Sequence, residues 1–197
     1  MKTVTLMNDD SPENPADFRG AWKLYSFSRK FASFEDPENF FPDGKPSIGL
    51  RRKLDTGLAF VLSYFEHGNC VWSRKGTGPQ CQWDNVQVAG ILIWEHKPKD
   101  MGAKSYDDRA KDADGFLEMY TCWCNGEVYG YSVEEEVMLP CGHTETKFID
   151  SCFGFYGNDM SYMAEQIREA LDGETEFEIK GEASDILDKS NLLPGVK

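Results

Sequence analysis

The stretches LAFVLSYF, from Leu58 to Phe65, and VQVAGILIW, from Val86 to Trp94, decide the fold of this chain. Both are rich in β-branched and aromatic residues and are apolar on neighbouring as well as alternate positions, which is typical of strands buried on both faces. Glycines at positions 68, 76 and 78 and the proline at 79 separate them and predict a loop or a short hairpin. We therefore expect a buried sheet in the first half of the chain.

A helix is expected after these strands, from Ser105 to about Trp123. Apolar side chains recur there at three- and four-residue spacing with charged residues between them, which is the pattern of an amphipathic helix. Ser105 with Asp108 resembles a capping arrangement at its start, and the pair Asn125-Gly126 favours a left-handed stop at its end.

The remainder predicts two strands and a second helix. Polar and apolar residues alternate over 127–137, and a further strand is expected over 147–156, so an antiparallel hairpin is the simplest connection. An apolar stripe from Met160 to Leu171 predicts a helix that Gly173 ends. The fold class expected is α+β, with a mainly antiparallel sheet packed by two amphipathic helices in a single domain.

The 197 residues are expected to divide into one core domain with two trimmings. Residues 1–19 read as a flexible leader, because the stretch around Pro12 and Pro15 is too polar to bury. The core is expected over 20–173, with an irregular loop over 32–47 pinned by Phe40 and Phe41. Residues 174–197 read as an acidic C-terminal tail.

The composition excludes several classes of protein. A formal net charge of -13 opposes direct nucleic-acid binding, which draws its affinity from Lys and Arg. The chain has no apolar run long enough to cross a membrane, and its N-terminus lacks the features of a signal peptide. We therefore expect a cytoplasmic protein whose six cysteines are reduced thiols.

No high-specificity catalytic motif is present, because the chain has no phosphate loop, no GxGxxG, no HExxH and no GxSxG. The thiols and imidazole of Cys122, Cys124, Cys141 and His143 are ligand types that zinc accepts. Residues two apart on a helix point about 200° from one another, which opposes a shared metal at the first pair. We expect neither a metal nor a cofactor, and the sequence discloses no reaction.

Polar residues flank the two buried strands. His67 follows the first strand, while Cys81, Trp83 and Asp84 open the second, so these groups are expected to converge at one edge of the sheet. His, Asp and Cys together are the raw material of nucleophilic catalysis, and they equally suit a structural polar network or a ligand site. Both interpretations stay open here.

Asp150 and Cys152 lie on one face of the last predicted strand. A carboxylate beside buried strand residues needs a partner or a cleft, since an isolated buried charge is costly. We therefore expect His67, Asp84 and Asp150 to belong to one polar cluster.

Four ordered motifs carry a resemblance to a family. They are HG at 67–68, CQWDNVQVAG at 81–90, GEVYGY at 126–131 and DSCFGFYG at 150–157. The chain resembles a widespread, uncharacterised family encoded by tailed bacteriophages and related mobile elements, whose motifs look like HSG, WDSGQVG, GxVYGY and DSCWGFYG. Gly68 stands where the family has Ser, Asn85-Val86 replaces Ser-Gly and Phe153 replaces Trp, and the missing Ser weakens the idea of a serine nucleophile.

The resemblance implies a protein made in the cytoplasm of an infected bacterium, and it implies no particular reaction. We expect a phage-type accessory protein that binds a host protein in host takeover or counter-defence, and the sequence does not indicate its oligomeric state. The alternatives are a hydrolase or transferase acting on a small molecule or nucleotide through His67 and Asp84, and an acidic nucleic-acid mimic acting through residues 165–188. The candidate binding residues are His67, Trp83, Asp84, Gln87, Asp150 and Cys152.

Overall fold

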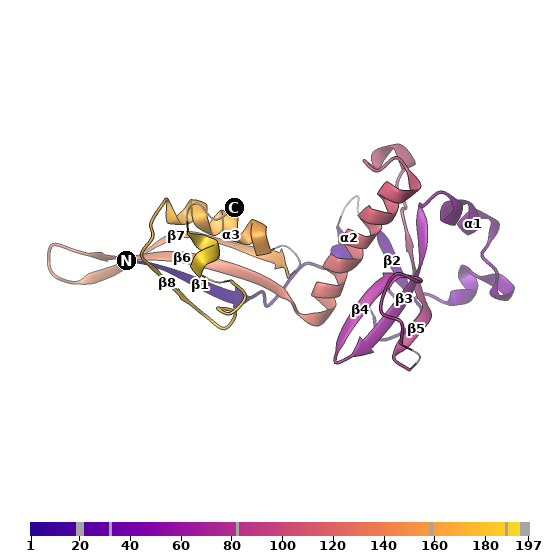
Figure 1. Ribbon diagram of the computed structural model, residues 1–197, viewed down its shortest axis with the longest axis horizontal. Helices are drawn as coiled ribbons and strands as arrows, with labels where there is room; N and C mark the ends of the chain where they lie inside the picture. The colour runs from indigo at the N-terminus through magenta and orange to yellow at the C-terminus, as the bar shows by residue number, and fades with distance from the viewer. Residues whose placement is uncertain (19–21, 32, 82, 158–159, 188, 194–197) are drawn as a thin grey trace. The chain divides into compact units, whose positions relative to one another are not determined.

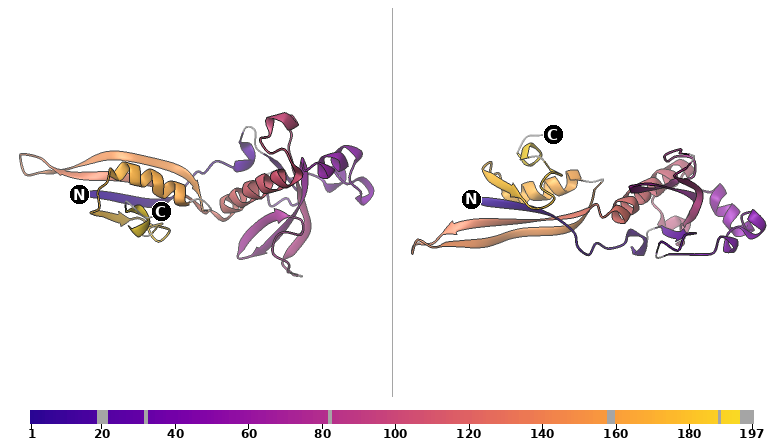
Figure 2. Two further views of the ribbon diagram at one scale, coloured as in Figure 1. Left: turned by 45° about the horizontal axis from the view of Figure 1, so that its top comes forward. Right: turned by 90° about the horizontal axis from the view of Figure 1, so that it is seen from below.

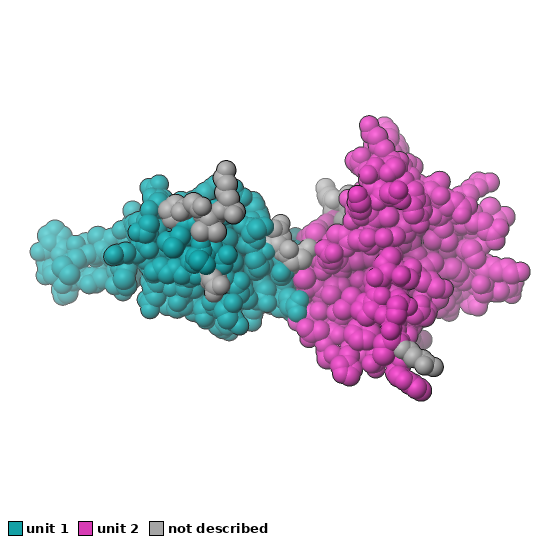
Figure 3. All heavy atoms as spheres, viewed as in Figure 1, with its two compact units in different colours: residues 1–13, 126–197 teal, residues 14–125 magenta. Residues whose placement is uncertain are grey.

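The computed structural model describes residues 1–18, 22–31, 33–81, 83–157, 160–187 and 189–193. It confirms the α+β class and the mainly antiparallel sheets. The chain forms two compact units, coloured separately in Figure 3. Unit 1 comprises residues 1–13 and 126–197, and unit 2 comprises residues 14–125.

The sheet of unit 2 is entirely antiparallel, in the order β2-β5-β3-β4. The two expected strands are confirmed as β3 (Ala59–His67) and β5 (Asn85–Ile93). Two strands escaped prediction, β2 (Lys23–Ser26) and β4 (Asn69–Arg74). The β3–β4 hairpin turns at Gly68, whose φ of +85° suits a residue without a β-carbon.

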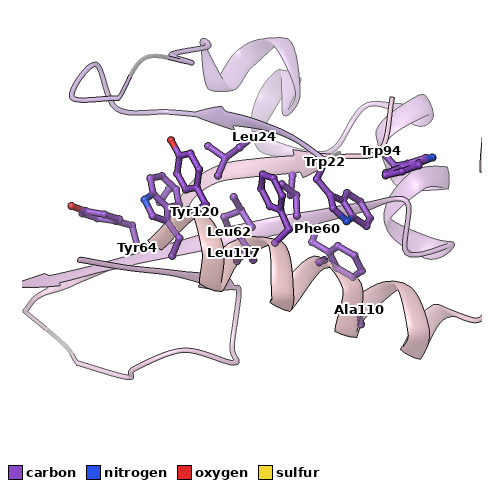
Figure 4. Packing of buried hydrophobic residues seen from close by; sticks show 14 of the residues in the cluster. Trp22, Leu24, Phe60, Leu62, Tyr64, Trp94, Ala110, Leu117 and Tyr120 are labelled. Carbon is purple, nitrogen blue, oxygen red and sulfur yellow. The ribbon is translucent and has the colours of Figure 1, made fainter. Parts of the chain in front are cut away.

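One face of this sheet packs on α2 (Tyr106–Asn125), as Figure 4 shows from close by. The predicted caps are confirmed: Asp108 N donates to Ser105 Oγ at 3.0 Å, and Gly126 ends the helix with a φ of +72°. Apolar residues from both layers form the larger core of unit 2, among them Trp22, Leu24, Phe60, Leu62, Trp72, Leu117 and Tyr120.

The other face of the unit 2 sheet packs on α1 (Ile48–Asp55) and the loop before it. That loop contains the short 3-10 turns η2 (Pro37–Asn39) and η3 (Pro42–Gly44), and Phe40 and Phe41 pack against the sheet as expected. Two further 3-10 turns, η1 (Pro15–Asp17) and η4 (Pro98–Asp100), lie elsewhere in this unit.

Unit 1 contains a second four-stranded sheet in the order β7-β6-β1-β8. The predicted hairpin is confirmed as β6 (Val128–Met138) and β7 (Thr144–Tyr156), and the predicted second helix as α3 (Met160–Leu171). Figures 1 and 2 show α3 lying over one face of this sheet. The other elements are β1 (Lys2–Asn8), β8 (Phe177–Lys180), which is parallel to β1, and the short helix α4 (Lys189–Leu192).

Residues 1–19 were expected to form a flexible leader, but Lys2–Asn8 form β1, which lies between β6 and β8 in the sheet. Val4 and Leu6 are fully buried, and Lys2 Nζ donates to Leu171 O at 2.9 Å at the C-terminal end of α3. The alternation of Thr and apolar residues over 3–7 is a strand pattern that the polar stretch after it obscured. Arg19 lies outside the described residues.

The expected core of 20–173 and tail of 174–197 also differ from the structure. Phe177, Ala183, Leu187 and Leu192 are buried in the unit 1 core, so the acidic segment completes that core. The apolar residues are spaced widely among acidic ones, which gives a negative segment that still contributes one buried face. The apolar residues that the sequence suggested for a single core are therefore divided between the separate cores of the two units.

Candidate functional site

The candidate site lies at the end of the unit 2 sheet where the β3–β4 hairpin turns. β4 is an edge strand, and α2 supplies the hydrogen-bond partners that another strand normally provides. Cys70 N donates to Asn125 Oδ1 at 2.9 Å, and Trp72 N donates to Thr121 Oγ1 at 3.0 Å. Asn125 Nδ2 in turn donates to Cys70 O at 3.0 Å. This end of β4 is therefore fixed against α2 by its backbone as well as by packing.

A cleft of about 230 Å³ opens beside it. Three aromatic rings form its inner wall, because the ring centroids of Phe31 and Trp72 are 4.9 Å apart and those of Tyr64 and Trp72 are also 4.9 Å apart. Figure 4 shows Tyr64 at the end of the core cluster. The outer wall is formed by Val86 and Val88 from the first half of β5.

A charged pair lies at the mouth of the cleft. Lys30 Nζ donates to Glu66 Oε1, and the Tyr64 hydroxyl donates to Glu66 Oε2 at 2.8 Å. Lys30, and after it Tyr64, hold the pKa of Glu66 below its ordinary value. Burial, and then Glu66, raise the pKa of Tyr64, so the phenol stays a neutral donor. The mouth thus offers an ammonium group and a carboxylate that are already paired to each other.

The same polar residues border a second cleft of about 220 Å³, which is also lined by Gly68, Asn69, Cys70, Cys124 and Asn125. Its walls are more polar than those of the first cleft, and it contains two thiols.

The structure brings three of the sequence-predicted groups together in unit 2. His67 Nδ1 lies 3.4 Å from Asp84 Oδ2, and Cys81 Sγ lies 3.5 Å from the same oxygen. Asp84 lies between the thiol and the imidazole, whereas in a nucleophilic triad the imidazole lies between the nucleophile and the carboxylate. The His67 side chain is 79% exposed. This geometry supports a surface polar pair more than a nucleophile with its base.

Asp150, the third residue of the expected cluster, belongs to unit 1, whereas His67 and Asp84 belong to unit 2, and it has a partner within unit 1. Tyr131 Oη donates to Asp150 Oδ2 at 2.7 Å, which is the paired arrangement that a half-buried carboxylate needs. Cys152 faces the same way on β7, opposite Tyr131, and is exposed. Asp150 and Cys152 share one face of β7, as their spacing predicted. The sequence did not indicate that β7 belongs to a different sheet from β3 and β5.

Of the other two candidates, Trp83 lies in the turn just before β5 and Gln87 lies on β5, and both are exposed, Trp83 to 87%. The residues that line the neighbouring cleft escaped prediction. One signal for them was present, since Val71 and Trp72 are a β-branched and an aromatic residue of the kind enriched in strands. Nothing in the local pattern pointed to Lys30 or Phe31, which reach the cleft from an irregular segment.

The thiols weighed as zinc ligands are distributed over both units. Cys122 and Cys124 lie two residues apart on α2, and Cys141 Sγ lies 3.7 Å from His143 Nδ1 at the tip of the β6–β7 hairpin. Among the described residues, no group of three or more His, Cys, Asp or Glu side chains is arranged to hold a metal ion.

Comparison of the chain with protein-family models, curated proteins and solved structures found no match. Within the part of the chain that the structure describes, no helix is both long and apolar enough to cross a membrane.

Proposed function

We propose that this chain acts by binding another protein, and that the partner docks at the turn end of the unit 2 sheet. We call this region the cleft surface, and it consists of Phe27, Phe31, Tyr64, Trp72, Trp83, Val86 and Val88.

The observation that carries the proposal is the exposure of three large apolar side chains within six residues. Trp83 is 87% exposed, Val86 53% and Val88 43%. Clustered apolar groups beside a concave site are typical of interfaces, and Trp is among the residues that contribute most to binding when a partner buries it. The cleft surface therefore offers an aromatic anchor next to a pocket that can accept an anchor from the partner.

The size of the cleft favours a protein side chain over a free small molecule. Pockets for drug-sized ligands usually measure about 300–1,000 Å³, whereas this cleft measures about 230 Å³. One apolar or aromatic side chain fits that volume. The paired Lys30 and Glu66 at the mouth suit polar groups at the rim of an interface.

The backbone of β5 gives the partner a further means of attachment. β5 begins at Asn85, whereas its pairing with β2 extends only from Gly90 to Ile93. Among the described residues, no strand pairs with residues 85–88 on the β2 side. An extended segment of a partner can add to such an edge through main-chain hydrogen bonds while its side chains enter the neighbouring pocket.

The resemblance to the phage family favours a protein of the bacterial host as this partner, in host takeover or counter-defence. The inference is by association, because a family context does not define a site. The cytoplasm of the host cell is then the compartment in which the two proteins meet.

A second candidate function, mimicry of a nucleic acid, is favoured by the distribution of charge. Unit 1 carries 19 acidic and 6 basic side chains and thus the whole net charge of -13, whereas unit 2 carries 15 of each. A concentrated negative field attracts the basic grooves of nucleic-acid enzymes over long range. The two functions predict different dependence on salt, because screening weakens exposed charge pairs and leaves apolar burial largely intact.

The test is capture from bacterial lysate on the tagged full chain, at low and at high salt, with bound proteins identified by mass spectrometry. The double variant Trp83→Ala/Val86→Ser removes two exposed members of the cleft surface, and Val137→Ser on unit 1 is the matched control, since Val137 is also exposed. We expect one protein to be retained by the wild type and by Val137→Ser at both salt concentrations, and lost by the double variant. Retention by the double variant, with loss at high salt, refutes docking at the cleft surface and supports mimicry.

A further inference from the structure

We propose that Cys70 and Cys124 form a thiol–disulfide exchange site that reacts with low-molecular-weight disulfides of the glutathione type. This proposal is independent of the docking proposal, because it rests on the two thiols of the second cleft.

The first observation is the placement of the two thiols. Cys70 lies on β4 and Cys124 on the last turn of α2, and both line the second cleft. Asn125, the neighbour of Cys124, holds the backbone of Cys70 through the hydrogen bonds at 2.9 and 3.0 Å. The two thiols are therefore held side by side by the same contacts that attach β4 to α2.

The second observation is access. Both residues line the second cleft of about 220 Å³. Cys70 is 6% exposed and Cys124 is half-buried. The S–S bond of a small, flexible disulfide and the groups beside it can enter a space of this size, whereas a folded protein cannot reach the sulfur of Cys70. The geometry therefore selects a low-molecular-weight reactant.

The third observation is the electrostatic asymmetry of the pair. The neighbouring Cys124 thiol lowers the pKa of the Cys70 thiol, against the opposing effect of burial, and Lys30 and Tyr64 lower it further while Glu66 raises it. The Cys70 thiol, together with burial, raises the pKa of Cys124, and Tyr120 and Trp72 oppose that rise. Since the thiolate is the attacking species in exchange, Cys70 is the nucleophile and Cys124 the resolving thiol.

The reaction balances in two steps. The Cys70 thiolate attacks one sulfur of the small disulfide, which breaks the S–S bond, forms a mixed disulfide at Cys70 and releases the other half as a thiolate. That thiolate, or water, takes the proton of Cys124. The Cys124 thiolate then attacks Cys70 Sγ, forms the Cys70–Cys124 disulfide and releases the second small thiol. The protein loses two electrons and two protons, and the small disulfide gains them.

The remaining cysteines provide internal controls. Cys141 and Cys152 are exposed, so each can form a mixed disulfide with a small thiol. Cys122 is buried and lies two residues before Cys124 on α2. The new disulfide closes a loop of roughly 55 residues within unit 2, and cross-links of such loops raise thermal stability when they fit the native geometry.

The test incubates the folded full chain, as the variant Cys141→Ser/Cys152→Ser, with a series of oxidised-to-reduced glutathione ratios. Intact mass and peptide mapping locate the products, and tryptophan fluorescence reports the Tm. We expect a Cys70–Cys124 cross-link with the mass loss of two hydrogens, a defined midpoint and a raised Tm. Folded protein that gains no such cross-link at the most oxidising ratio overturns the proposal.

A second variant tests the assignment of roles. With Cys124→Ser added, we expect one glutathionyl group trapped on Cys70, and with Cys122→Ser added, the cross-link as before. Loss of the cross-link in Cys122→Ser, or a folded Cys124→Ser variant that stays unmodified at Cys70, contradicts the assigned roles. If one of these further variants fails to fold, the presence or absence of the Cys70–Cys124 cross-link in the Cys141→Ser/Cys152→Ser protein still tests the proposal.

Discussion

The two units have similar sheets and opposite electrostatics. Each unit has a four-stranded sheet with a long helix on one face, yet unit 1 carries the whole net charge of -13 and unit 2 carries none. Ion pairs of unit 2 include Lys23–Glu95, Lys30–Glu66, His67–Asp84 and Arg74–Asp114, and unit 1 contains Lys2–Glu174. Unit 2 thus has equal numbers of acidic and basic side chains, while unit 1 has a large excess of carboxylates.

The edges of the two sheets differ in the same sense. The edge strand β4 of unit 2 is covered, because Asn125 and Thr121 of α2 accept from its backbone. The edge strand β7 of unit 1 runs for 13 residues, and its register shifts twice against β6. Such irregularities discourage other strands from adding to an edge. The β4 edge of unit 2 is therefore satisfied by packing, and the β7 edge of unit 1 is protected by distortion and charge.

The largest expected effect separates the two units in stability. Leu6 in unit 1 and Leu62 in unit 2 are both fully buried strand residues, so each Leu→Ala change should cost about 2–5 kcal/mol of the unfolding free energy of its own unit. All five tryptophans lie in unit 2, so tryptophan fluorescence follows that unit alone. In urea titrations, we expect Leu62→Ala to shift the fluorescence transition and Leu6→Ala to shift only the far-UV circular dichroism. Equal shifts of fluorescence for both variants mean that the units unfold as one.

The covered edge of β4 gives the next effect. Asn125→Ala removes both hydrogen bonds to the backbone of Cys70, and leaving such groups unpaired costs about 1–3 kcal/mol. We expect the fluorescence midpoint in urea to fall accordingly. An unchanged midpoint means that water satisfies this edge as well as α2 does.

Added salt should affect the two units differently, and its effect on stability should be smaller than that of the substitutions above. Screening weakens the repulsion among the uncompensated carboxylates of unit 1 and equally weakens the exposed ion pairs of unit 2, each worth about 0–1 kcal/mol. We expect added sodium chloride to slow hydrogen exchange in β6, β7 and α3 and to leave β3 and β5 almost unchanged. Equal slowing in both sets of peptides removes the electrostatic contrast between the units.

The smallest effect concerns Glu66. Its folded-state pKa lies below the ordinary 4.5, chiefly because of Lys30, so its contribution to stability is present above that value and is lost as the pH falls through the lowered pKa. Glu66→Gln should remove that part of the acid dependence of the fluorescence transition. Identical pH profiles for the wild type and Glu66→Gln below about pH 5 contradict the pairing with Lys30.

Local patterns predicted much of the fold. The apolar runs of β3 and β5, the alternation of β6 and the caps at Ser105 and Gly126 identify their elements because each depends on neighbouring residues. The division into two units was not predictable in this way, because it depends on which sheet each strand joins. β1 illustrates this, since its partners β6 and β8 are separated from it by the whole of unit 2.

The candidate site was predicted in part for the same reason. His67 and Asp84 lie 3.4 Å apart, as expected from the strand ends that are visible in the sequence. The wall formed by Phe31 and the charge of Lys30 come from an irregular segment, whose path tertiary packing decides. The sequence did not indicate that Asp150 belongs to another unit than His67 and Asp84, because strand patterns do not specify the sheet that a strand joins.

The most direct test of the central claim is hydrogen exchange measured on the full chain, free and in complex with its captured partner. Docking at the cleft surface predicts slowed exchange in peptides that cover residues 27–31 and 83–89, with exchange in β6, β7 and α3 unchanged. Protection confined to the peptides of unit 1 contradicts docking at the cleft surface and assigns the interaction to the acidic unit.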